Sequence, residues 1–253
     1  MKSAAFALSA LLALLQAPTI TRMNDRELDG LKGPAKQVFE ESSEIGEGSR
    51  ICRDRTLAYD PQGRLTSTSE YYGVRCDEEI KDTYDYDSEG NRHWRHDTSR
   101  ARGILGSQPT GTSADSVNKR IFEADQQGRM VVTNFIYDSL GRLVHGVVQI
   151  YDSQNRLFES QSLDSDKRII GRITFSYKER EPFPASSISF GRDGKPNSRT
   201  TYSDYKLNAR GDWIRRTEIR EQSGRSVFSI QQGNPGEAVS RFARLIYRTI
   251  DYY

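Results

Sequence analysis

Short apolar and aromatic runs, separated by turn-forming residues, recur through most of the chain. The most strand-like runs are residues 130–137 and 143–151, which are rich in Val, Ile, Phe and Tyr, the residue types that favour β-strands. The run from Leu65 to Tyr71 is apolar at its ends and polar in its middle, so it cannot cover a thick apolar core. Residues 238–253 are expected to form a closing strand. The pattern therefore predicts a chain made mainly of strands.

The turns between these runs share a motif that reads aromatic, Asp, two spacers, Gly, Arg and an apolar residue. One copy starts at Tyr137 and the next at Tyr151, and most copies are separated by one, two or three units of about thirteen residues. A period this short leaves room for one strand and one turn per copy. The residues that carry the motif are Tyr59, Asp60, Gly63, Arg64, Tyr86, Asp87, Gly90, Asp125, Gly128, Arg129, Tyr137, Asp138, Gly141, Arg142, Tyr151, Asp152, Asn155 and Arg156.

Each residue type in the motif has a role in building a turn. An Asp at the head of a turn accepts hydrogen bonds from backbone N–H groups two residues on. The Gly takes a positive φ without a Cβ penalty, and Asn155 is the next best residue for that conformation. A turn of this type joins antiparallel strands. The Arg can pair with the turn Asp or lie over the Tyr ring.

The Tyr-Asp-x-x-Gly-Arg-Leu units resemble the YD repeats of RHS and teneurin-type bacterial cell-surface proteins, over about residues 59 to 225. The stretches 30–38 and 248–253 also resemble the ends of small secreted YD-repeat proteins. The resemblance implies a β-sheet fold and an exported protein. The chain lacks the RHS core segment and a toxin domain, so toxin encapsulation is not implied.

The chain divides into a signal peptide, a linker and one domain. Residues 1–17 have the short positive start and apolar run of a secretory signal peptide, with an uncertain cleavage position. Residues 18–34 are expected to be an N-terminal linker, and 35–253 a single domain with a loop at about 100–117, where Gly and Pro are frequent. The predicted fold is all-β, an antiparallel meander of hairpins forming a large twisted, curled or partly closed sheet. The protein is expected to be secreted, periplasmic or on a bacterial cell surface.

Composition narrows the class further. Hydrophobic residues are only 35% and Tyr outnumbers Trp by 13 to 2, so we expect a thin core in which Tyr rings pack and keep their hydroxyls wet. The net charge is +2 and Arg is spread one per turn, which argues against nucleic-acid binding. Outward apolar rows are too interrupted for a membrane β-barrel, so no membrane span is expected after signal removal.

Two cysteines, Cys52 and Cys76, flank the turn at residues 62–63. An even cysteine count in an exported protein favours a disulfide between them, with two free buried thiols as the alternative. His93 and His96 would point to opposite faces of a strand, and His145 is isolated, so no metal site is predicted.

No catalytic motif or cofactor-binding motif is present. A Gly-x-Ser-x-Gly elbow and a Gly-x-Gly-x-x-Gly unit are both lacking, and the acidic pair at 164 and 166 lacks the rest of a calcium loop. The sequence therefore predicts no enzyme and no cofactor, but an exported binding or structural module that contacts a glycan or a protein through its sheet face. The alternatives are a periplasmic carbohydrate-active enzyme with paired carboxylates, or an accessory or immunity partner of an RHS system.

Overall fold

The computed structural model of the protein describes residues 22–45, 51–72, 78–97, 116–223 and 239–253. These residues form one short helix, α2 (Asp25–Leu28), and fourteen strands. The strands are β1 (Ala35–Glu44), β2 (Ile51–Tyr59), β3 (Leu65–Tyr72), β4 (Glu78–Tyr86), β5 (Arg92–Asp97), β6 (Ser116–Ala124), β7 (Met130–Tyr137), β8 (Leu143–Tyr151), β9 (Leu157–Leu163), β10 (Ile169–Tyr177), β11 (Pro184–Phe190), β12 (Pro196–Leu207), β13 (Trp213–Ser223) and β14 (Val239–Tyr252).

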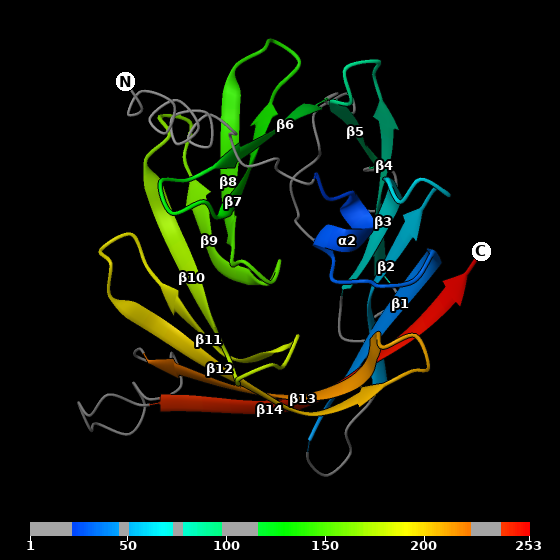
Figure 1. Ribbon diagram of the computed structural model, residues 1–253, viewed down its shortest axis with the longest axis vertical. Coiled ribbons are helices and arrows are strands. Elements are labelled where there is room, and N and C mark those ends of the chain that lie inside the picture. Colours follow the sequence, from blue (N-terminus) through cyan, green and yellow to red (C-terminus); the bar gives the residue numbers. More distant parts are fainter. Residues whose placement is uncertain (1–21, 46–50, 73–77, 98–115, 224–238) are drawn as a thin grey trace, which may run out of the picture.

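The strands form an antiparallel meander that closes on itself. Each strand pairs with the next along the chain, and β1 pairs with β14, for example at Val38↔Ile250 (Figure 1). The predicted all-β antiparallel meander is confirmed. The expectation of a curled or only partly closed sheet is wrong, because β1 pairs with the Arg244–Tyr252 part of β14 and closes the barrel. Closure satisfies the backbone groups of two edges that would otherwise be open to other chains.

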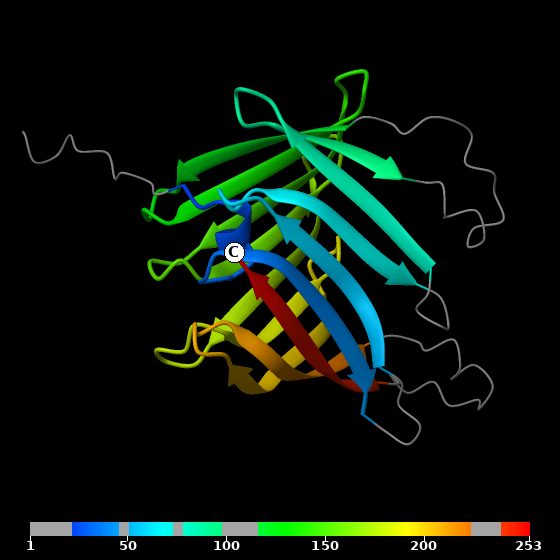
Figure 2. The ribbon, with the colours of Figure 1, turned by 90° about the vertical axis from the view of Figure 1, so that its right-hand side faces the viewer.

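The turns that join even strands to the following odd strands lie at one end of the barrel, here called the mouth end. These turns are at residues 60–63, 87–90, 125–128, 152–155, 178–181 and 208–211. The C-terminus lies at the same end, beside the residues that precede β1, because the Tyr253 N–H donates to the Pro34 carbonyl (3.1 Å; Figure 2).

The turn at residues 138–141 shows how the repeated motif works. Asp138 Oδ1 accepts the backbone N–H of Leu140 and of Arg142, each at 2.9 Å, and Asp138 Oδ2 accepts Nε of Arg142 at 2.8 Å. Gly141 has φ +74°, the left-handed conformation that a Cβ disfavours. These hydrogen bonds hold the pKa of Asp138 below its usual range, chiefly through the Arg142 N–H. The carboxylate thus caps the turn and orients the arginine.

The seam between β5 and β6, called the β5–β6 seam below, has the shortest pairing in the described sheet. Only three register pairs join these strands, from Arg92↔Asn118 to Trp94↔Ser116, whereas eight pairs join β6 to β7. Backbone pairing alone therefore holds the wall weakly at this point, and other contacts must support it.

Buried apolar residues gather around the segment that carries α2 rather than filling the whole barrel. One cluster joins Leu31 to strands β1 to β3, and a second joins β7 and β8 to Met23 and Leu28. Elsewhere the inward positions are often polar or charged, among them Glu40, Glu218 and Arg248, which are at most 8% exposed. The thin core expected from the composition is organised by an element that the strand pattern did not reveal.

Candidate functional site

Residues 22–32, called the plug segment below, enter the barrel at the mouth end (Figures 1 and 2). Asn24 and Glu27 form a capping box at the start of α2, each side chain accepting the other residue's N–H (3.0 and 2.9 Å). The Arg26 N–H donates to the carbonyl of Gly63 in the β2–β3 turn at 3.0 Å. The helix is therefore tied to the barrel wall, inside the stretch expected to be a linker.

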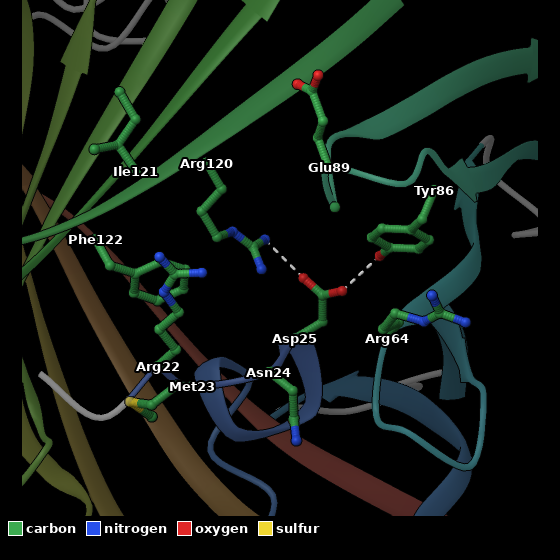
Figure 3. A pocket seen from close by; sticks show the side chains of 11 residues that line it. Arg22, Met23, Asn24, Asp25, Arg64, Tyr86, Glu89, Arg120, Ile121 and Phe122 are labelled. Atoms are coloured by element: carbon green, nitrogen blue, oxygen red, sulfur yellow. Dashed lines mark hydrogen bonds and ion pairs between the residues drawn. The ribbon is translucent and has the colours of Figure 1, made fainter.

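Asp25 connects the plug segment to strands β3 to β6. Its carboxylate accepts the Tyr86 hydroxyl at 2.5 Å and the Leu65 N–H at 2.9 Å, and it pairs with Arg120 at 2.6 Å (Figure 3). Arg92 lies farther away, at 3.9 Å. Burial alone would raise the pKa of Asp25, but Arg120, Tyr86, the Leu65 N–H and Arg92 together hold it below its usual range. Because Arg92 and Arg120 belong to β5 and β6, this one carboxylate bridges the β5–β6 seam.

Asp29, at the end of α2, makes a second contact with the wall. Its Oδ2 accepts the hydroxyl of Tyr59 at 2.6 Å. Burial raises the pKa of Asp29, and the hydrogen bond from Tyr59 and the charges of Arg55 and Arg248 only partly offset it. Asp25 and Asp29 therefore have opposite pKa shifts: cations lower the pKa of Asp25, whereas burial raises that of Asp29.

Cavities lie on both sides of the plug segment. The first, of about 560 Å³, lies between the plug and strands β4 and β6, and Figure 3 shows Arg22, Arg64 and Arg120 around it. The second, of about 620 Å³, is called the lumen cavity below. Its apolar and aromatic lining consists of Met23, Leu28, Leu31, Tyr151, Leu157, Phe175, Tyr177, Pro182, Phe183, Pro184 and Trp213.

The lumen cavity opens at the mouth end and has charged groups along one wall. Exposed residues at its rim include Gly30, Gln154 and Pro182. Arg216 on β13 and Arg248 on β14 also line it. The shape is that of a pocket with an apolar lining and a cationic wall.

Trp213 joins the apolar and cationic parts of the lumen cavity. The guanidinium carbon of Arg248 lies 3.7 Å from the centre of a Trp213 ring, and that of Arg216 lies at 4.2 Å. Arg248 pairs with Glu40 at 2.6 Å, and Arg216 pairs with Glu218. Cation–π contacts of this kind stabilise a desolvated guanidinium by about 2 kcal/mol. The two arginines are thus fixed in place before any ligand arrives.

Glu40 and Glu218 each pair with two arginines. Glu40 also pairs with Arg55 at 2.6 Å, and Glu218 also pairs with Arg244 at 3.0 Å. Burial raises the pKa of Glu40, but Arg248 and Arg55 outweigh it and lower the pKa to about 2. Both glutamates are therefore committed to ion pairs.

Three polar atoms of side chains that line the lumen cavity are buried without a hydrogen-bond partner among the described residues. They are Tyr151 Oη, Arg248 Nη1 and Arg216 Nε. Tyr151 is 2% exposed and Arg248 is 8% exposed. Burial, followed by the nearby Asp29 charge, raises the pKa of Tyr151. Buried polar groups of native proteins are paired in the great majority of cases, so these three atoms are exceptions, as are several outside the cavity.

The residues singled out from the sequence fall mostly in turns, as in the turn at Asp138, but the structure uses three of their tyrosines differently. Tyr59 and Tyr86 donate to the plug segment, and Tyr151 lines the lumen cavity, all at the mouth end. Tyr137, at the opposite end, packs against Phe135 with ring centres 6.5 Å apart. The motif therefore brings together part of a candidate site that turn chemistry alone did not indicate.

The remaining acidic, glycine and arginine residues of the motif stay at the turns. Arg64 and Arg156 also lie over the Tyr86 and Tyr177 rings, at 5.1 and 4.5 Å. The β8–β9 turn uses Asn155 at φ 58° in place of Gly. The turn residues Asp60, Asp87, Gly90, Asp125, Gly128, Arg129, Gly141, Arg142 and Asp152 occupy the corresponding positions of their own turns.

The cysteine, loop and signal-peptide predictions involve residues outside the described ranges, whereas the histidine prediction can be compared with the structure. Cys52 lies on β2, whereas Cys76 lies outside the described residues, so their disulfide stays a prediction. The loop expected at 100–117 and the signal peptide at 1–17 also lie largely or wholly outside them. His93 lies 3.4 Å from Asp87 at an exposed turn. Within the described ranges no group of three or more His, Cys, Asp or Glu residues could hold a metal ion.

The inner-wall groups were not found from the sequence. Glu40 and Arg248 are 208 positions apart, and nothing local to either residue marks them as neighbours. The plug segment had a recognisable sequence signal, because Asn24 followed three residues later by Glu27 is the pattern of a capping box.

In the part of the chain that the structure describes, no helix is long and apolar enough to cross a membrane.

Comparisons with known proteins give a distant likeness to barrels. No protein-family model and no curated protein matches the chain. A porin-like protein from Bacteroides uniformis is similar at 12% identity and a TM-score of 0.43, covering 87% of this chain and 99% of that one. A porin-like protein from Bacteroides vulgatus is similar at 11% identity and a TM-score of 0.38, covering 87% of this chain and 98% of that one. A chain from Vibrio parahaemolyticus is described as an outer membrane lipoprotein-sorting protein domain. It is similar at 9% identity and a TM-score of 0.32, covering 87% of each chain.

These results correct the resemblance to YD-repeat proteins of the RHS and teneurin type. No family model supports it, and the similar structures reported above are described as porin-like or lipoprotein-sorting proteins. The physical reason is that the Asp-x-x-Gly-Arg turn is a local solution to reversing a strand. A closed barrel with many short turns arrives at the same residues. In this chain the motif specifies turn geometry.

Proposed function

We propose that the protein is an exported, non-catalytic binding protein that holds a small, largely apolar ligand in the lumen cavity. The observation that carries the proposal is the cavity itself. Its volume of about 620 Å³ falls in the range of ligand pockets, and its lining is mostly apolar and aromatic with a few fixed polar groups. A core that was merely well packed would leave no space of this size.

The arrangement of carboxylates favours binding over catalysis. A glycoside hydrolase needs one carboxyl group that donates a proton and another that acts as base or nucleophile. Glu40 and Glu218 are each held by two arginines, and the pKa of Glu40 is lowered to about 2. Asp25 is likewise engaged by Arg120 and Tyr86. These groups serve as counter-ions, so the carbohydrate-active alternative has less support than binding.

The place of contact differs from the one expected from the sequence. An open sheet would offer its concave face to a glycan or a protein, whereas in the closed barrel the concave face becomes the wall of a lumen. The plug segment narrows the mouth and forms part of the lining through Met23 and Leu28. An apolar ligand enclosed in this way is shielded from water, which suits a carrier or sensor in an extracytoplasmic compartment reached through the signal sequence.

The test is binding of a neutral apolar fluorophore, N-phenyl-1-naphthylamine, to the exported full-length protein. We expect the fluorescence to rise on binding, and Leu157→Trp to weaken the affinity about tenfold because the larger ring fills the cavity. Val144→Trp is the matched control, since Val144 is 54% exposed on a neighbouring strand. No binding by the wild-type protein, or equal affinity of the two variants, would overturn the proposal.

A further inference from the structure

We infer that the ligand of the lumen cavity is an anionic amphiphile, an apolar body with a carboxylate or phosphate head, and that Arg216 and Arg248 receive the head. The inference rests on the proposed function and adds the chemical class of the ligand. The side chains that carry it come from β13 and β14 and share contact with Trp213.

The charge on the lining favours an anion. The side chains of Lys32, Arg156, Arg216 and Arg248 line the lumen cavity, against only two acidic ones, Glu27 and Asp29. Glu27 is engaged in the helix cap. The backbone N–H of Lys32 donates to Asp212 Oδ1 at 2.6 Å, whereas its ammonium has no carboxylate within ion-pair distance among the described residues and lies 5.8 Å from the centre of the Phe183 ring.

The inner-wall ion pairs leave the cations in excess. Glu40 is shared between Arg55 and Arg248, and Glu218 between Arg216 and Arg244. Each carboxylate therefore faces two guanidinium groups. Water screens the charges of Arg55 and Arg244, whose side chains are 40% and 50% exposed, but it reaches Arg216 and Arg248 less, at 21% and 6%. An approaching anion would offset the excess charge at these last two arginines.

The unpartnered atoms specify the kind of atom that is missing. Nη1 of Arg248 and Nε of Arg216 have no hydrogen-bond partner among the described residues and are donors only, so any group that pairs with them must be an acceptor. Arg248 is 8% exposed, and leaving a buried charged donor unpaired is costly. Carboxylate and phosphate oxygens match the planar fork of a guanidinium better than any neutral acceptor.

The apolar lining sets the other half of the ligand. Phe175, Tyr177 and Leu157 line the same cavity as the two arginines, and Tyr177 already donates its hydroxyl to the Leu157 carbonyl at 2.9 Å. That wall therefore offers hydrocarbon contact and few free polar groups. A free inorganic anion would leave it empty, which is why we infer an anion attached to an apolar chain or ring.

The experiment compares dodecanoate, dodecyl phosphate, dodecanol and inorganic phosphate by isothermal titration calorimetry on the exported full-length protein. We expect dodecanoate or dodecyl phosphate to bind at least about tenfold more tightly than dodecanol, and inorganic phosphate to bind weakly. The first two ligands tell a carboxylate head from a phosphate head. If no chain compound binds, the proposed function fails; if all three chain compounds bind equally, only this inference fails.

Arg216→Gln and Arg244→Gln form a matched pair. Each removes one positive charge from Glu218 and leaves it the other arginine, but only Arg216 lines the lumen cavity. We expect Arg216→Gln to reduce the preference for the anion to about threefold or less and Arg216→Lys to restore part of it, while Arg244→Gln has a smaller effect. Equal effects of the two glutamine variants would overturn the inference. Should Arg216→Gln fail to fold, the wild-type comparison of dodecanoate with dodecanol decides.

Discussion

Replacing Asp25 by Asn tests whether the plug segment holds the barrel together. The substitution keeps the shape of the side chain and removes its charge, so the partly buried guanidinium of Arg120 loses its counter-ion. Asp25 is 5% exposed. Breaking a buried pair by removing one partner costs about 3–5 kcal/mol. We expect the lower end of this range, because the amide oxygen can still accept the Leu65 N–H.

The measurement is urea unfolding followed by tryptophan fluorescence. At a denaturant dependence of about 3 kcal/mol per molar, a loss of about 3 kcal/mol lowers the midpoint by about 1 M. Asp138→Asn, at an exposed turn of the opposite end, should have a smaller effect. Arg120→Met alone should also destabilise, and the double variant should cost less than the sum because the two side chains contact each other. Strict additivity, or an equal loss in the Asp138 variant, would refute the bridging role.

The pH dependence gives an independent check on the same residue. The folded-state pKa of Asp25 is lowered, so its contribution to stability is present above the unfolded value of about 3.9 and is lost as the pH falls through the folded value. We therefore expect the acid limb of the stability curve to be shallower in Asp25→Asn than in the wild-type protein. Parallel limbs would contradict the assigned ion pair.

Two further substitutions probe the contacts around the plug segment. Gly63→Ala should destabilise the protein more than Gly141→Ala. Both residues have a positive φ, but only a Cβ at Gly63 would lie 2.8 Å from the Asn24 side chain that caps α2. Thermal unfolding of both variants measures the difference, and equal losses would mean that the plug segment shifts without cost. Tyr151→Phe should leave the free energy of unfolding nearly unchanged, because the Tyr151 hydroxyl has no hydrogen-bond partner among the described residues. Tyr177→Phe should lower it by about 1 kcal/mol in chemical unfolding, because the hydrogen bond to the Leu157 carbonyl is lost. A larger loss in Tyr151→Phe than in Tyr177→Phe would show that the Tyr151 hydroxyl is already satisfied.

The strands were predictable because their ends are marked locally. Asp138 and Gly141 specify a turn through contacts within four residues, so a single stretch of sequence contains the whole signal. Closure had no such mark, because the pairing of Val38 with Ile250 depends on the accumulated twist and register of every strand between them.

The candidate site was harder to predict than the fold, since its members come from distant strands. The motif placed each repeated tyrosine at a strand end, but which of these tyrosines would point at the plug segment depends on the end of the barrel at which its turn lies. Tyr59, Tyr86 and Tyr151 lie at the mouth end, and Tyr137 lies at the other. Glu40 and Arg248 become neighbours only when β1 and β14 pair.

The pairing of β1 with β14 also has a consequence for folding kinetics. The first strand is synthesised before its final partner exists, and the contact between Glu40 and Arg248 spans 208 positions. Forming contacts this remote requires most of the intervening chain to be ordered first, so such topologies fold slowly. Until then the unpaired backbone of β1 can recruit strands from other molecules. Assembly of this protein should therefore be sensitive to its concentration and assisted by factors that keep unfolded chains apart.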